Sequence, residues 1–141
     1  MTSLAPGITT GAVRLLLVED NAVLAEATAE YLKLSGLDVF IAVDGKDALQ
    51  AVGVFRPEII LCDLRLPDIS GLDLLQAFRL NPDTEDAVLA LHSAVSEVDL
   101  HEANAQIDLF LSKPLTKEKI QCLLHVLDGK HTKERSEAAR G

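Results

Sequence analysis

Five short, nearly uninterrupted apolar runs constrain the fold of this chain more than any other feature. They occupy residues 13–18, 38–43, 58–62, 87–91 and 107–111. A strand with one face in water alternates apolar and polar residues, whereas several of these runs are apolar at almost every position. The runs are therefore typical of strands that are buried on both faces, as in a parallel sheet.

The segments between the runs carry apolar residues at helical spacing. The four patterns consist of Leu24, Ala27, Tyr31 and Leu34; Ala48, Val52 and Phe55; Leu72, Leu75 and Phe78; and Ile120, Leu123, Leu124 and Leu127. Ser70, Ser96 and Thr116 are placed as helix caps, and Gly36 and Gly129 mark helix ends. This alternation predicts an α/β fold in which an open five-stranded parallel sheet is covered on both faces by right-handed crossovers.

Composition and charge narrow the class of protein. At 141 residues the chain has the length of one domain, and its formal net charge of −9 disfavours direct binding to nucleic acid or anionic lipid. No apolar run reaches the roughly 18 residues of a membrane span, and residues 1–12 lack the features of a signal peptide. We therefore expect a cytoplasmic protein. Cys62 and Cys122 form no disulfide framework, and we interpret them as apolar core residues.

The residues that end the apolar runs share a chemical character. In an open parallel sheet the functional crevice lies at the carboxyl ends of the strands, so these residues are expected to share one rim. They are Glu19 and Asp20 after the first run, Asp63 after the third, His92 and Ser93 after the fourth, and Ser112, Lys113 and Pro114 after the fifth. Three acids, a hydroxyl and a lysine are thereby predicted to converge.

Such a cluster of acids needs positive charge. Two ionised carboxylates about 4 Å apart repel each other by about 4 kcal/mol at an effective dielectric constant near 20. Either one carboxylate stays protonated, or Lys113 and a hard divalent cation neutralise the cluster, and oxygen ligands suit Mg²⁺ best. A carboxylate beside Mg²⁺ can attack phosphorus and form an aspartyl phosphate, which makes Asp63 a candidate nucleophile.

Over residues 13–128 the sequence resembles the receiver domains of two-component response regulators. The acidic pair lies in LLLVEDN, and Asp63 lies in IILCDLRLPDISG with Pro67 and Gly71 four and eight residues further on. The hydroxyl residue Ser93 lies in LHSA, and Lys113 precedes a proline in FLSKPL. The resemblance implies a flavodoxin-like, doubly wound (βα)5 fold with three α/β/α layers and strand order 2-1-3-4-5.

The resemblance also assigns roles to these residues. Asp63 is the implied phosphoacceptor, with a histidine kinase or a histidine phosphotransfer protein as donor. The implied Mg²⁺ ligands are the side chains of Asp20 and Asp63 and the main-chain carbonyl of Arg65, while Glu19 acts through water. Ser93 and Lys113 are implied to hold phosphoryl oxygens.

A switch is a further implication of the resemblance. Phe110 stands three positions before Lys113, where the family has an aromatic residue. Phosphorylation is then expected to draw Ser93 inward and to let Phe110 turn in behind it. This remodels what we call the switch face, formed by the helix after the fourth strand, the fifth strand and the last helix. Two copies of a receiver can pair through such a face. A cis peptide bond between Lys113 and Pro114 is also implied.

A few positions depart from the family pattern or flank the site. Leu66 stands where methionine is common, and Gln106 stands where a glycine usually precedes the fifth strand. Arg65 and Val95 each follow a site residue by two positions and flank the path of water, so we predict that they tune the lifetime of the phosphoryl group. We interpret His92 as a packed side chain, since a lone imidazole offers no metal-ligand spacing.

The sequence therefore predicts a receiver domain that takes a phosphoryl group onto Asp63 with Mg²⁺ and signals to an unidentified output protein. It assists its own phosphorylation and slow dephosphorylation, and it is not a conventional enzyme that releases a metabolite. The domain is expected over residues 13–128, with a disordered leader at 1–12 and a disordered tail or linker remnant at 129–141. A stand-alone regulator and the receiver of a hybrid histidine kinase both fit.

Other interpretations of the function remain. A degenerate receiver that acts as a phosphorylation-independent interaction module is disfavoured because all the acids and the lysine are present. A phosphatase with an aspartate nucleophile has a second acid where this chain has Arg65, and a flavodoxin-like nucleotide enzyme lacks its glycine-rich phosphate loop here. For the acidic pair alone, helix capping by Asp20 or Asn21 is an equal alternative.

Overall fold

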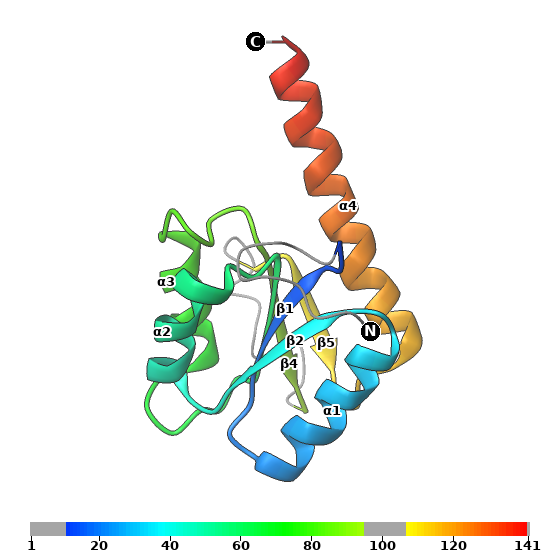
Figure 1. Ribbon diagram of the computed structural model, residues 1–141. Coiled ribbons are helices and arrows are strands. Elements are labelled where there is room, and N and C mark those ends of the chain that lie inside the picture. The colour runs from blue at the N-terminus through cyan, green and yellow to red at the C-terminus, as the bar shows by residue number, and fades with distance from the viewer. Residues whose placement is uncertain (1–10, 95–106, 141) are drawn as a thin grey trace.

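The computed structural model describes residues 11–94 and 107–140 and contains one five-stranded parallel sheet (Figure 1). The strands are β1 (Arg14–Val18), β2 (Asp38–Ala42), β3 (Ile59–Cys62), β4 (Val88–Ser93) and β5 (Leu109–Ser112). Their order in the sheet is β2-β1-β3-β4-β5, and every neighbouring pair is parallel. The predicted fold class and strand order are confirmed.

Helices cover both faces of the sheet and divide the core into two layers. The described helices are α1 (Ala22–Leu34), α2 (Gly45–Phe55), α3 (Gly71–Arg79) and α4 (Lys117–Arg140). Figure 1 shows α2 and α3 on one side of the sheet and α1 and α4 on the other. Phe78 of α3 is buried in the first layer, and Leu123 of α4 is buried in the second. The helix expected after Ser96 lies outside the described residues, as do Val95 and Gln106.

Strand register brings the ends of four strands to one edge. Val18 of β1 lies opposite Cys62 of β3, and Cys62 lies opposite Leu91 of β4. Ser93 at the end of β4 lies opposite Ser112 of β5. The residues that follow these positions therefore emerge together at the carboxyl-terminal edge, which we call the rim.

The helix termini follow the local signals of the sequence in most places. Asn21 caps α1 by accepting a hydrogen bond from the backbone N–H of Leu24, so this capping role falls to Asn21. Ser70 caps α3, and the Thr116 hydroxyl accepts a hydrogen bond from the N–H of Lys119 in the first turn of α4. Gly36, just beyond α1, has a φ of +94°, a conformation that favours glycine.

Two predictions about helix faces were wrong. The buried face of α1 consists of Ala25, Thr28, Ala29 and Leu32, whereas Leu34 from the predicted pattern is 78% exposed. Three of these four side chains are small, which allows the helix to lie close to the sheet, and Leu34 is left on the outer face. Cys122 is exposed because it lies on the outer face of α4, whereas Cys62 is buried as predicted.

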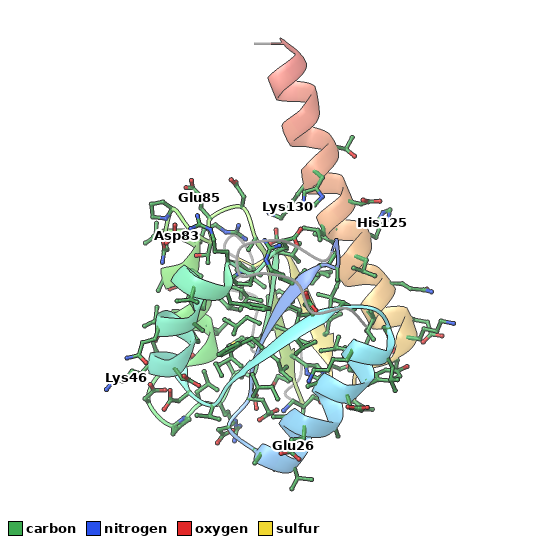
Figure 2. All side chains as sticks on the ribbon, viewed as in Figure 1. Glu26, Lys46, Asp83, Glu85, His125 and Lys130 are labelled. Carbon is green, nitrogen blue, oxygen red and sulfur yellow. The ribbon has the colours of Figure 1, made fainter. Side chains whose placement is uncertain are left out.

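The prediction that Gly129 ends the last helix was also wrong. Helix α4 runs through Gly129 to Arg140, over residues that were predicted to form a tail. A glycine costs a helix interior only about 1 kcal/mol relative to alanine. Side-chain contacts hold the helix just beyond this point, since Lys130 forms an ion pair with Asp108 at 3.4 Å and His131 lies 3.8 Å from Glu58 (Figure 2 labels Lys130). Among the described residues, no helix has both the length and the apolar content to cross a membrane.

Candidate functional site

The ammonium group of Lys113 connects two of the acids at the rim. Lys113 Nζ lies 2.7 Å from Oε1 of Glu19 and 3.0 Å from Oδ2 of Asp63. Glu19 and Lys113 are far apart in the sequence, and the parallel register of β1, β3, β4 and β5 brings them together. Asp20 lies beside the other two acids: one carboxylate oxygen from each of Glu19, Asp20 and Asp63 lies within 4.8 Å of the others.

The electrostatics of this cluster are those of partly buried charges. Burial raises the pKa of Glu19, although the Lys113 ammonium group opposes that effect. For Lys113, burial lowers the pKa, but hydrogen bonds to Glu19 and Asp63 outweigh it, so its pKa is raised overall. The 2.7 Å contact between Lys113 and Glu19 is typical of a charge-assisted hydrogen bond. Lys113 therefore stays protonated at neutral pH.

The backbone around Asp63 explains why glycine follows it by eight residues. The N–H of Asp63 donates to the carbonyl of Val18 at 3.0 Å, and the N–H of Gly71 donates to the carbonyl of Leu64 at 2.8 Å. A Cβ atom on Gly71 would collide with the carbonyl oxygen of Asp63. Only glycine allows α3 to begin this close to the end of β3.

The side chain of Asp63 has a second fixed contact. Its Oδ1 atom accepts a hydrogen bond from the N–H of Arg65 at 3.2 Å, while Oδ2 faces Lys113. The two oxygens of the carboxylate are thus held by groups on opposite sides. The carboxylate remains partly exposed at 13% and lies at the surface of the rim.

The end of β4 supplies a buried hydroxyl and a buried imidazole. Ser93 is 5% exposed, and its carbonyl accepts a hydrogen bond from the N–H of Lys113 at 3.0 Å. His92 is 4% exposed, and its Nε2 atom has no hydrogen-bond partner within the described structure. Burial, together with the charge of Lys113, lowers the pKa of His92 to about 4. His92 is therefore a neutral, packed side chain, in keeping with its interpretation from the sequence.

The turn after β5 completes the rim. The Lys113-Pro114 peptide bond is cis, as predicted. The ammonium group of Lys119 donates to the carbonyl of Ser112 at 2.6 Å and to the carbonyl of Pro114 at 3.0 Å. Phe110 is half-buried within β5 and packs against the core layer below α2 and α3.

Sequence reasoning missed two side chains that fasten this region. In the sequence Lys119 is only one polar residue of a predicted helix, and nothing indicates that it bonds to the preceding turn. Asp68 accepts hydrogen bonds from the N–H groups of Gly45 and Lys46 at the start of α2, each at 2.9 Å. No local pattern predicts a contact between residues more than 20 positions apart, so only the folded structure identifies Asp68.

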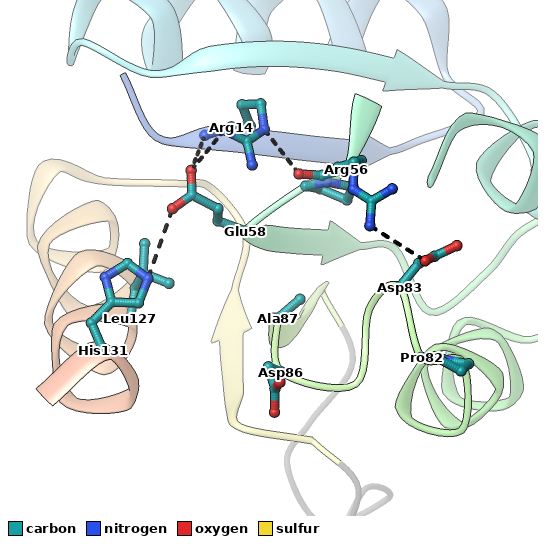
Figure 3. Close-up of a pocket in the computed structure, with 10 residues that line it drawn as sticks. Arg14, Arg56, Glu58, Pro82, Asp83, Asp86, Ala87, Leu127 and His131 are labelled. Atoms are coloured by element: carbon teal, nitrogen blue, oxygen red, sulfur yellow. Dashed lines mark hydrogen bonds and ion pairs between the residues drawn. The ribbon is translucent and has the colours of Figure 1, made fainter. Parts of the chain in front are cut away.

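The opposite edge of the sheet has a cleft in which charges are paired (Figure 3). Arg14 lies 3.4 Å from Glu58, and Arg56 lies 3.6 Å from Asp83. The guanidinium of Arg14 also donates to the carbonyl of Arg56 at 2.9 Å. These contacts join β1, the turn before β3 and the loop before β4, and they indicate a structural role for this cleft.

The acids, the lysine and the strand order can be compared with known proteins. Residues 15–125 match the family described as the response regulator receiver domain. The chain belongs to this family. This receiver domain is 32% identical over 123 residues to the luminescence regulatory protein LuxO of Vibrio campbellii, covering 86% of this chain and 27% of that protein. It is 34% identical over 116 residues to the probable transcriptional regulatory protein TcrX of Mycobacterium tuberculosis, covering 82% and 49%.

Solved structures show the same relationship. A CheY-like receiver domain from Methylobacillus flagellatus has 30% sequence identity and a TM-score of 0.76, covering 83% of this chain and 99% of that one. The signal receiver domain of a putative LuxO repressor protein from Vibrio parahaemolyticus has 29% identity and a TM-score of 0.76, covering 89% and 98%. The chain thus spans almost the whole of these isolated domains, but only about a quarter to a half of the curated relatives.

Proposed function

We propose that this receiver domain accepts a phosphoryl group on Asp63 from a phosphohistidine donor, either a histidine kinase or a histidine phosphotransfer protein. The observation that carries the proposal is the single ammonium group of Lys113, which lies between Glu19 and Asp63 with Asp20 beside them. Two acids share this lysine, and a third acid lies beside them at the rim. Such an arrangement favours a cationic ligand, and the bound cation can then offset the negative charge of a phosphoryl donor.

The acidic residues suit Mg²⁺. Their donor atoms are all oxygens, and they lie close enough together for one ion to contact more than one carboxylate. Asp20, Asp63 and the main-chain carbonyl of Arg65 would hold the ion directly, and Glu19 would act through water. When bound, Mg²⁺ supplies the positive charge that offsets the oxygens of the transferring phosphoryl group.

The reaction is a displacement at phosphorus. A carboxylate oxygen of Asp63 forms a bond to phosphorus while the nitrogen–phosphorus bond of the donor breaks, and the electron pair of that bond returns to the donor imidazole. The ammonium group of Lys113 and the hydroxyl of Ser93 would hold phosphoryl oxygens. The Arg65 N–H orients one oxygen of Asp63, and Lys113 contacts the other.

Phosphorylation would then change a protein-binding surface. Ser93 and Phe110 lie near each other in the sheet, since Phe110 pairs with Leu91 and Ser112 pairs with Ser93. Movement of Ser93 towards a phosphoryl group would open space for the Phe110 ring, and the switch face around β5 and α4 would change shape. The output protein would bind this switch face, and two copies of the chain could pair through it. The proposed role involves no direct contact with nucleic acid or membrane.

The proposed role includes catalysis of its own modification without turnover of a released metabolite. The phosphoaspartate would hydrolyse slowly, at a rate that Arg65 and Val95 help to set. We place this activity in the cytoplasm and assign it to residues 13–128. Both a stand-alone regulator and the receiver of a longer hybrid kinase are compatible with this role.

The test is exposure of the protein to acetyl phosphate, or to beryllofluoride as a mimic, with and without Mg²⁺. Intact mass or NMR shifts report modification of the parent and of Asp63→Asn. Modification that requires Mg²⁺ and disappears in Asp63→Asn supports the proposal. A parent that is not modified would instead favour a phosphorylation-independent interaction module.

A further inference from the structure

The loop that follows Asp63, residues 64–70, is closed at its base. The N–H of Gly71 donates to the carbonyl of Leu64, and Arg65 forms an isolated antiparallel bridge with Ser70. Gly71 packs directly against the backbone of Asp63. The two ends of the loop are therefore fixed to each other and to the phosphoacceptor.

The tip of this loop is fastened to a different element. The carboxylate of Asp68 accepts hydrogen bonds at 2.9 Å from two consecutive backbone N–H groups, those of Gly45 and Lys46. A Cβ atom on Gly45 would collide with the side chain of Ile69, so the start of α2 and the loop are in close contact. Figure 2 labels Lys46 at this end of α2. The two N–H groups lower the pKa of Asp68, which stays ionised at neutral pH.

We propose that Asp68 is a positioning residue for the phosphoryl site, because it fastens residues 64–70 to α2 and so fixes the backbone of Arg65. From Arg65 the effect reaches the reacting group through one contact, the hydrogen bond from the Arg65 N–H to Oδ1 of Asp63. The same peptide segment carries the Arg65 carbonyl, the proposed main-chain ligand of Mg²⁺. This inference rests on the proposed function of Asp63, and Asp68 itself touches neither the metal nor the phosphoryl group.

A purely structural role for Asp68 can be separated from this one by a matched control. Asp44 caps the same helix, since its Oδ1 atom accepts a hydrogen bond from the N–H of Asp47 at 2.7 Å. This contact is local to the start of α2 and does not reach the loop. Loss of either carboxylate weakens the start of α2, but only loss of Asp68 releases residues 64–70.

The experiment compares Asp68→Ala and Asp44→Ala in the full chain by two readouts. The first is hydrogen exchange of the Arg65 amide without metal or phosphate, and the second is Mg²⁺ affinity from NMR titration. Asp68→Ala should speed exchange at Arg65 and weaken Mg²⁺ binding roughly tenfold, at the low end of the range for residues that orient metal ligands. Asp44→Ala should leave both unchanged, and Asp68→Asn, which keeps one acceptor oxygen, should restore part of each.

Equal behaviour of Asp68→Ala and Asp44→Ala in both readouts would overturn the inference, because Asp68 would then act only as a helix cap. This outcome is distinguishable from failure of the proposed function. If the parent takes up no phosphoryl group, the proposed function fails, whereas exchange at Arg65 still measures the effect of Asp68 on the loop.

Discussion

The two edges of the sheet carry the same kinds of charged residue but balance them differently. At the edge away from the rim, Asp108 has two cations of its own, Arg79 at 2.9 Å and Lys130 at 3.4 Å, and accepts a hydrogen bond from the N–H of Leu89. At the rim, Asp63 shares Lys113 with Glu19. A carboxylate supplied with its own cations stabilises structure, whereas acids that share one cation are suited to a ligand that brings more positive charge.

The largest expected difference between the two edges is in phosphoryl uptake. Asp63→Asn should abolish Mg²⁺-dependent modification by acetyl phosphate, because the nucleophilic carboxylate is lost. Asp108→Asn should retain modification but lower the free energy of unfolding by about 1–2 kcal/mol, since its ion pairs are partly exposed. Intact mass and urea denaturation measure the two effects. Uptake by Asp63→Asn at the parental rate would contradict the assignment of the acceptor.

The two lysines should also differ. Lys113→Ala should slow modification on the order of 100-fold, because it removes a cation that would face the charge of the transferring group. Lys130→Ala removes a lysine from the opposite edge and should leave the rate unchanged. Stopped reactions followed by mass give both rates, and equal rates for the two variants would place Lys113 outside the site.

Two glycines test how closely the rim is packed. Gly71→Ala should destabilise the protein by up to about 3 kcal/mol, the upper part of the range for overpacking, because its Cβ would meet the backbone of Asp63. Gly53→Ala, within α2, has nothing within 4 Å of its Cβ position and should stabilise by up to about 1 kcal/mol. Urea denaturation of both variants is the measurement. A neutral Gly71→Ala would mean that the loop moves aside easily.

A smaller effect is expected in the pH dependence of stability. Burial lowers the pKa of His92 from 6.5 to about 4, so the unfolded chain binds more protons than the folded one between these values. Stability from this residue is therefore lost as pH falls, by about 2 kcal/mol between pH 7 and pH 5. His92→Leu should lose less stability than the parent over that interval, measured by denaturation at both pH values. Identical losses would show that His92 does not stay neutral in the folded protein.

The sequence predicts the sheet well because a continuous apolar run is buried on both faces only when the strand lies between two layers of helices. The residues 59–62 of β3 are all buried, and the acid that follows them is then forced to the rim. The helices are less well predicted. Helix α1 has two apolar stripes, and hydrophobicity alone does not choose the stripe with Ala25 and Leu32 over the stripe with Tyr31 and Leu34. The choice depends on how the helix packs against the sheet.

The site follows the same division. Glu19, Asp63 and Lys113 can be identified from the sequence because each follows a predicted strand, and the carboxyl ends of parallel strands lie along one edge of the sheet. Asp68 could not be identified in this way, because its hydrogen-bond partners at Gly45 and Lys46 depend on how α2 and the loop meet in the fold. Gly129 shows a related difficulty, since the helix that continues past it contacts distant residues through Lys130 and His131.

The length of α4 has a mechanical consequence. At about 1.5 Å per residue, the part beyond Leu127, the last side chain of α4 in the described core, extends about 20 Å (Figure 1). A tilt of about 10° at Leu127 would displace the far end of a straight helix of that length by about 3 Å. The contacts of Lys130 with Asp108 and of His131 with Glu58 lie within four residues of Leu127, so they oppose such a tilt only weakly. Small rearrangements beside β5 would therefore cause their largest displacement at the far end of α4.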